Sequence, residues 1–209
     1  EKALVLNPIA TGSFWLRGYI YLCKGDFKEA QKDFERLLDS EEKTAHLDGR
    51  GGFARLHLLR GKFEEAKKQL SSGMEEAREL NAWDYETRTH LIRAYLEWRS
   101  GNLEEALKEC DQAGDLAVAN ELADVQRSSR MLKAMIFLEM NQIDRAQDTA
   151  TELSSLIEKG LNKKLIRMSD VVAGMIELKR KNFSQAIEYL NKAISLLPCQ
   201  YAMDSEHGL

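Results

Sequence analysis

The sequence is poor in the residues that interrupt helices or build covalent frameworks. Its 209 residues include only two prolines and three cysteines. Ala, Leu, Glu, Lys and Arg are abundant, and their side chains lose little freedom in a helix. Cys23, Cys110 and Cys199 are far apart and form no CxxC pair, which predicts small buried hydrophobes in a reducing compartment. We therefore expect an all-α protein in the cytoplasm.

A strong charge of one sign and a long apolar run are also lacking. The net charge of −4 and the isoelectric point near 5.7 provide no basic field for neutralising phosphates, so we expect no nucleic-acid partner. No uninterrupted apolar run approaches the ~18 residues of a membrane span, so we expect no membrane association. With 44% hydrophobic residues, the chain still has enough apolar surface for an extensive core.

Catalytic and metal-binding constellations are not apparent either. There is no HExxH motif, and the histidines have no companion at metal-ligand spacing: His46, His57, His90 and His207. His57 stands where other units have Tyr21 and Phe137, which predicts a packing role. We expect no enzymatic activity, no cofactor and no metal.

The glycine-rich stretch GRGG, residues 49–52, lacks the preceding buried strand and the Gly-Lys-Ser/Thr ending of a phosphate-binding loop. Its place at the start of a helical segment gives a different prediction. Gly51 and Gly52 would let a neighbouring backbone come close or leave a dent in the surface.

A six-residue phrase returns along the whole chain. Its final alanine falls at positions 30, 66, 106, 146 and 186, in steps of 36, 40, 40 and 40 residues. Apolar residues recur at helical spacing before and after each phrase, which predicts two helices joined by its first residues. The copies are GDFKEA, GKFEEA, GNLEEA, NQIDRA and KNFSQA, and the small residues twelve positions before each alanine are Gly18, Ala54, Ala94, Ala134 and Gly174.

Each position of the phrase has a chemical interpretation. The first residue is of a type that tolerates the left-handed conformation ending a helix, except for Lys181. The third is apolar and is predicted to fill the space beneath the turn. The alanine is small because another helix must approach there. The third residues are Phe27, Phe63, Leu103, Ile143 and Phe183.

These features resemble the tetratricopeptide repeat, which has a small residue at its eighth place, Gly or Asn near the fifteenth, an apolar residue at the seventeenth and Ala at the twentieth. The resemblance implies a right-handed superhelical solenoid of antiparallel helix pairs. The usual period is 34 residues, so the six extra residues predict longer helices or a longer loop.

The resemblance also divides the chain, taken as one array over residues 1–209. Lys2–Pro8 is a near copy of Lys192–Pro198, so we expect a piece cut from a longer protein. The predicted boundaries are the tail of a preceding repeat at 1–8, repeats at 11–44, 47–82, 84–120, 121–160 and 162–198, and the start of a further repeat at 199–209.

In this family, the first helix of each pair lines a concave surface. The resemblance therefore implies a non-enzymatic scaffold that binds a peptide or helix of a partner protein in this groove. The corresponding residues here are Trp15, Tyr19, Arg55, Arg88, Leu91, Tyr95, Trp98, Arg99, Met131, Met135, Met175 and Lys179. The methionines among them suit either core packing or an adaptable binding surface.

Two interpretations of the charge pattern stay open. The first helices are rich in Arg and Lys, and the second helices are rich in acids. The groove would then suit an acidic segment with hydrophobic anchors, or the arginines pair with acids on adjacent helices. The Lys and Asn clamp of chaperone-tail binders is absent, because Trp15, Leu16 and Tyr19, then Gly51, Gly52 and Arg55, occupy its places.

Two other functions are alternatives to groove binding. One is an architectural segment that self-associates through apolar end faces. The other is a sensor arm of a larger regulatory protein or enzyme, with the chemistry outside this chain.

Overall fold

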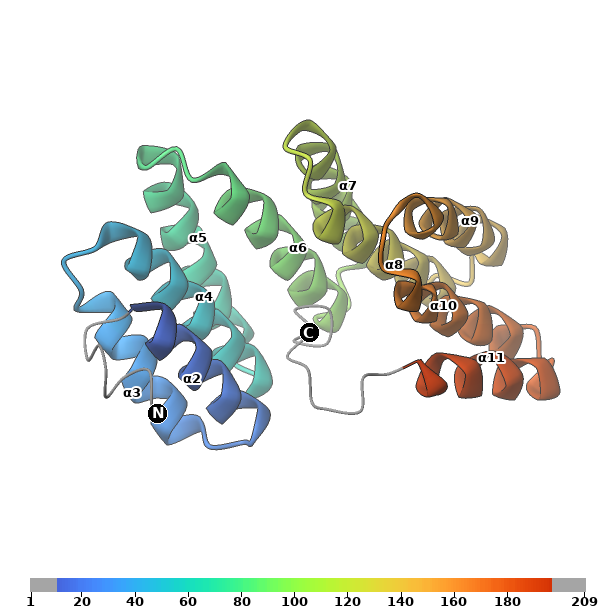
Figure 1. Ribbon diagram of the computed structural model, residues 1–209, viewed down its shortest axis with the longest axis horizontal. Coiled ribbons are helices and arrows are strands. Elements are labelled where there is room, and N and C mark those ends of the chain that lie inside the picture. The colour runs from blue at the N-terminus through green and yellow to red at the C-terminus, as the bar shows by residue number, and fades with distance from the viewer. Residues whose placement is uncertain (1–10, 197–209) are drawn as a thin grey trace. The chain divides into compact units, whose positions relative to one another are not determined.

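The structure is a computed structural model that describes residues 11–196 (Figure 1). Every regular element in this part of the chain is a helix, as the sequence predicts. The α-helices are α2 (Thr11–Cys23), α3 (Phe27–Leu38), α4 (Lys43–Leu59), α5 (Phe63–Glu79), α6 (Trp83–Arg99), α7 (Leu103–Ala119), α8 (Ala123–Glu139), α9 (Ile143–Lys159), α10 (Ile166–Lys179) and α11 (Phe183–Ser195), and the 3-10 helix η1 spans Lys163–Leu165.

The 40-residue period comes from the length of the helices. From α4 to α9 each helix has 17 residues and begins 20 residues after the one before it. Only three residues join neighbours in this stretch. The extra length of each repeat therefore lies in the helices and not in the loops, and the structural unit is a 20-residue helix plus turn. Helix α4 begins at Lys43, inside the stretch assigned to the first repeat.

The same left-handed turn follows first and second helices. The first residue of every phrase has a positive φ, including Lys181 with 66°. Asn81 and Glu121, which follow second helices, adopt the same conformation with φ of 53° and 57°. In each case the next backbone N–H bonds back to a helical carbonyl, as from Lys62 to His57 at 2.9 Å.

The chain forms two compact units, one ending at Thr89 and the other beginning at His90 within α6. In the first unit, α3 packs against α2 and α4, and α4 packs against α5 (Figure 1). In the second unit, α8 packs against α7 and α9, and α10 packs against α9 and α11. Each unit thus repeats the antiparallel pairing of successive helices.

Small residues set the distance between helices, as predicted. The phrase alanines are at most 2% exposed: Ala30, Ala66, Ala106, Ala146 and Ala186. The glycines at the eighth place are equally constrained. A Cβ on Gly18 would lie 2.6 Å from the Phe34 ring, and one on Gly174 would lie 2.8 Å from Leu190. A larger residue at these points would push the helices apart.

The glycine-rich stretch corrects one expectation. A side chain, and not a backbone, approaches Gly52, where a Cβ would lie 2.4 Å from the Phe34 ring. At Gly51 the nearest atom to such a Cβ is 3.6 Å away, so there is room. The two neighbouring glycines therefore have different roles, close packing at Gly52 and open space at Gly51.

The cysteines also differ from one another. Cys110 is buried, and burial raises the pKa of its thiol to about 12, as expected of a packing residue. Cys23 is exposed, which corrects the prediction that it is buried, because its place at the end of α2 lies beyond the covering helices. Cys199, His207 and the segments 1–8 and 199–209 lie outside the described residues.

Helix α11 differs from the other second helices in its exposed apolar side chains. Phe183, Ile187 and Ile194 are about 60% exposed. Phe183 stands at a phrase position that is half-buried in the other four copies, such as Phe27. Ile194 corresponds to Leu38, which packs beside Gly49 of the following helix. This face is therefore the kind that a following first helix covers elsewhere in the chain.

The two neighbouring glycines of α4 give a matched test of this packing. Gly52→Ala should destabilise the protein by about 1–3 kcal/mol, because the new methyl group overlaps the Phe34 ring. Gly51→Ala meets only ordinary contacts and should be neutral or stabilising by up to ~1 kcal/mol through helix propensity. Urea unfolding of both variants measures the difference, and equal stabilities would contradict the proposed role of Gly52.

Candidate functional site

The twelve predicted site residues all lie on first helices, α2, α4, α6, α8 and α10. They divide between the two units. Trp15, Tyr19, Arg55 and Arg88 belong to the first unit, and the others belong to the second. The two sets are therefore described separately.

In the first unit, Trp15 and Tyr19 form a stacked pair one helical turn apart. Their ring centroids are 5.7 Å apart with an angle of 13° between the planes. The guanidinium carbon of Arg55 lies 5.9 Å from the Tyr19 ring, within range of a cation–π interaction. Burial raises the pKa of Tyr19 and lowers that of Arg55. The set is thus an aromatic pair capped by one partly buried cation.

In the second unit, Tyr95 and Trp98 of α6 meet edge to face, with ring centroids 5.7 Å apart. The indole N–H of Trp98 donates to the Glu139 carboxylate of α8, linking two consecutive first helices. Both rings are half-buried and pack against the core. They keep part of their surface accessible while their positions are fixed by neighbours.

Burial corrects two members of the predicted site. Tyr19 and Leu91 are only 7% and 9% exposed and belong to the hydrophobic cores. Their neighbours on adjacent helices cover them, so packing is their role. Arg99 and Lys179, at the ends of α6 and α10, are exposed.

The methionines of the second unit have mixed roles. Met168 is part of the core and only 3% exposed. Met131, Met135 and Met175 are half-buried and pack against the same core. These three combine a fixed contact on one side with a flexible apolar surface on the other.

Ion pairs within and between helix pairs use much of the first-helix charge. Arg50 contacts Glu76 at 2.5 Å, and Arg93 contacts Glu109 at 2.9 Å. Two further pairs, Arg130 with Glu152 at 2.8 Å and Lys133 with Asp111 at 2.5 Å, have the same character. For these four cations the pairing interpretation is correct. The positive charge predicted for the inner surface is reduced accordingly.

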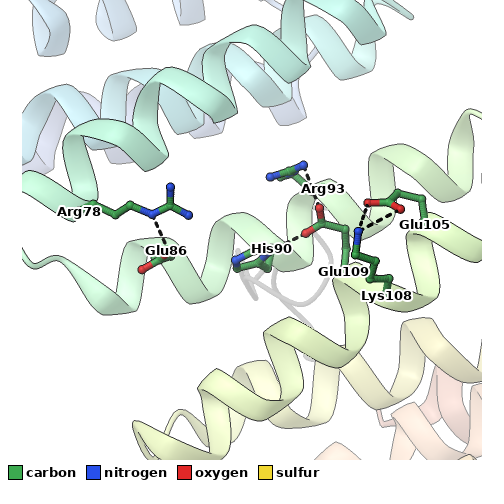
Figure 2. A network of polar contacts seen from close by, with 7 residues as sticks. All are labelled: Arg78, Glu86, His90, Arg93, Glu105, Lys108 and Glu109. Atoms are coloured by element: carbon green, nitrogen blue, oxygen red, sulfur yellow. Dashed lines mark hydrogen bonds and ion pairs between the residues drawn. The ribbon is translucent and has the colours of Figure 1, made fainter.

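A buried polar cluster joins α6 to α7 (Figure 2). Glu109 lies between His90 and Arg93, with its two carboxylate oxygens 2.6 Å from His90 Nδ1 and 2.9 Å from Arg93 Nη2. His90 is 8% and Glu109 is 3% exposed. The sequence analysis missed this cluster. A signal was present, since His90 has the place of Arg50 and Arg130 in their helices, and both of these also bind acids.

The other searches for chemistry concern residues 11–196. His57 stacks on Phe53 with ring centroids 6.1 Å apart, and burial lowers its pKa, as expected of a packing residue. No group of three or more His, Cys, Asp or Glu side chains in this range is placed to hold a metal ion. None of the helices between these limits has both the length and the apolar character needed to cross a membrane.

Comparison with protein families places these features in a known group. Two tetratricopeptide-repeat families match, one over residues 22–84 and one over residues 171–198. The chain contains tetratricopeptide repeats. No curated protein sequence matches it.

Solved structures with similar folds are also tetratricopeptide-repeat proteins. The TPR-like repeats of a Podospora anserina protein named as a kinesin light chain are 14% identical, with a TM-score of 0.66 over 91% of this chain and 96% of that one. BtubC from P. vanneervenii is 14% identical, with a TM-score of 0.69 over 93% and 84%. A chain of the APC/C heterotetramer Cut9–Hcn1 is 16% identical, with a TM-score of 0.69 over 93% and 35%.

These similarities confirm the predicted fold class, an all-α superhelix of helix pairs. Tetratricopeptide repeats are in general protein-interaction scaffolds and not enzymes. In this chain, each repeat combines an almost invariant set of small packing residues with a first helix whose outer residues differ from repeat to repeat.

The buried carboxylate of the third repeat gives a test of its structural role. Glu109→Ala should lower the free energy of unfolding by about 3 kcal/mol, because His90 and Arg93 lose their shared acceptor in a buried setting. Glu105→Ala, on the same helix, removes only an exposed pair with Lys108 and should cost no more than ~0.5 kcal/mol. Urea unfolding compares the two, and a similar small loss in both would show that the cluster contributes little.

Proposed function

We propose that this chain is a scaffold that binds a helix or extended peptide of a partner protein along its first-helix surface. The observation that carries the proposal is the aromatic pair of Tyr95 and Trp98. It lies on a first helix, remains half accessible, and is tied to the next first helix through Glu139. A large apolar surface held in one position is what a hydrophobic anchor of a partner requires.

The physical chemistry of this surface favours binding. Trp and Tyr are among the residues that contribute most to interface energies. The hydrogen bond from Trp98 to Glu139 restricts the indole before binding, so less side-chain entropy is lost when a partner docks. Met131 and Met135 of α8 can adjust their shape to the anchor.

Charge has a secondary role in this proposal. Several first-helix cations are already neutralised by acids of the second helices, such as Arg93 by Glu109. Arg99 and Lys179 are exposed and supply positive charge at the ends of α6 and α10. Acidic residues beside the partner's hydrophobic anchors would match them. Such exposed charges guide orientation and association rate more than affinity.

Two tryptophans on α6 provide a matched test. Trp98→Ala should abolish capture of a partner that the wild-type chain retains in an affinity pull-down, because the central anchor surface is lost. Trp83→Ala, which removes a side chain 50% exposed at the start of the same helix, should leave capture unchanged.

Because Trp98 also covers part of the core, its variant should melt at a lower temperature yet keep its helical circular dichroism. Trp98→Phe retains most of the apolar surface but loses the bond to Glu139, and we expect intermediate capture. If folded Trp98→Ala captures the same partner as the wild type, the proposed anchor is wrong.

A further inference from the structure

Two buried polar atoms of the first unit have no hydrogen-bond partner among the described residues. They are Nε of Arg55 on α4 and the hydroxyl of Tyr85 on α6. More than nine in ten buried polar groups in native proteins are satisfied, by protein, water or ligand. Two unsatisfied donors in one region therefore indicate a missing acceptor.

Arg55 differs from the other arginines of the first helices. Arg50, Arg93 and Arg130 each contact a carboxylate, whereas between residues 11 and 196 no carboxylate lies within ion-pair distance of Arg55. One of its terminal nitrogens donates to the Gly51 carbonyl at 3.5 Å, the upper limit of a hydrogen bond. Burial lowers its pKa, since its charge is partly removed from water without an anion to compensate it.

The space beside these donors is created by Gly51. A Cβ at this residue would lie 3.6 Å from Nη1 of Arg55 and 4.0 Å from the Tyr85 hydroxyl, so both groups border one small region. The corresponding residues in the next three first helices are Leu91, Met131 and Val171, each with a large side chain. Only the helix with the unsatisfied arginine leaves this place open.

We propose that the region over Gly51 binds one carboxylate of an aspartate or glutamate in the partner segment, with Arg55 and Tyr85 as donors. The inference rests on the proposed function, because it assigns part of the same first-helix surface to a specific group of the partner. The stacked Trp15 and Tyr19 hold one side of the guanidinium through the Tyr19 ring. The carboxylate would supply the missing negative charge.

The surrounding charges select a carboxylate over a phosphate. Asp48 lies close enough to Arg55 and Tyr85 to influence both, and Asp84 lies close to Asp48. Arg88 adds positive charge near Arg55. With acids nearby, a single negative charge is balanced, whereas a doubly charged phosphate would be repelled. A carboxylate is also planar and matches the guanidinium fork.

The test uses acetate as the probe and the whole chain labelled with 15N. Sodium acetate should shift the Nε–Hε resonance of Arg55 in a saturable manner, at ionic strength held constant with sodium chloride. The Arg130 resonance should remain in place, because its carboxylate partner is internal. Sodium phosphate at the same concentration and pH should shift Arg55 less than acetate.

Two variants make the result specific. Gly51→Ala fills the region with a methyl group, and Tyr85→Phe removes one donor, so both should lose most of the acetate-induced shift while keeping their helical circular dichroism. An unmoved Arg55 resonance, or equal acetate and phosphate shifts, would overturn the assignment. An undiminished shift in Gly51→Ala would overturn it as well.

The outcome is independent of the test of the proposed function. Arg55 belongs to the first unit, whereas Trp98 belongs to the second. Loss of capture in Trp98→Ala together with an unresponsive Arg55 would leave the scaffold function standing and remove the carboxylate site. A responsive Arg55 with capture unaffected by Trp98→Ala would do the reverse.

Discussion

The structure depends on close contact between helices at small residues. Where Ala106 or Gly52 lies, no atom larger than a methyl group or a hydrogen fits, and a ring or backbone of the next helix fills the space. This contact fixes the helix distance and leaves little freedom in the packing residues. Variation is therefore confined to the outer residues of the first helices, where Trp98 stands in one repeat and Leu138 in another.

The sequence allowed the helix pairs to be predicted because their turns carry visible signals. The phrase beginning at Gly61 marks one turn by a glycine and the following helix by an apolar residue. The turns at Asn81 and Glu121 were not predicted, since they reach the left-handed conformation without glycine and at an energetic cost. Half of the 20-residue period was hidden for this reason. The helix lengths then followed only from the structure.

The candidate site was predictable in its helices but not in its burial. The spacing placed Tyr19 and Tyr95 on first helices, yet only the covering neighbours decide that Tyr19 is buried and Tyr95 half accessible. The contact between His90 and Glu109 joins residues 19 apart, and periodicity does not identify such a pair. The unsatisfied Arg55 likewise emerges only when the carboxylate partners of the other arginines are known. Contacts across helices were thus the part that sequence patterns could not supply.

The account assigns packing to the second helices and recognition to the first. Hydroxyl-radical footprinting of the chain with and without a captured partner measures this directly, because it reports the exposure of individual side chains. We predict that binding lowers the oxidation of Trp98, Met131 and Met135, while oxidation of the exposed Trp83 and Tyr189 stays unchanged. Protection of Trp83 or Tyr189, with Trp98 and the two methionines unaffected, would contradict the account.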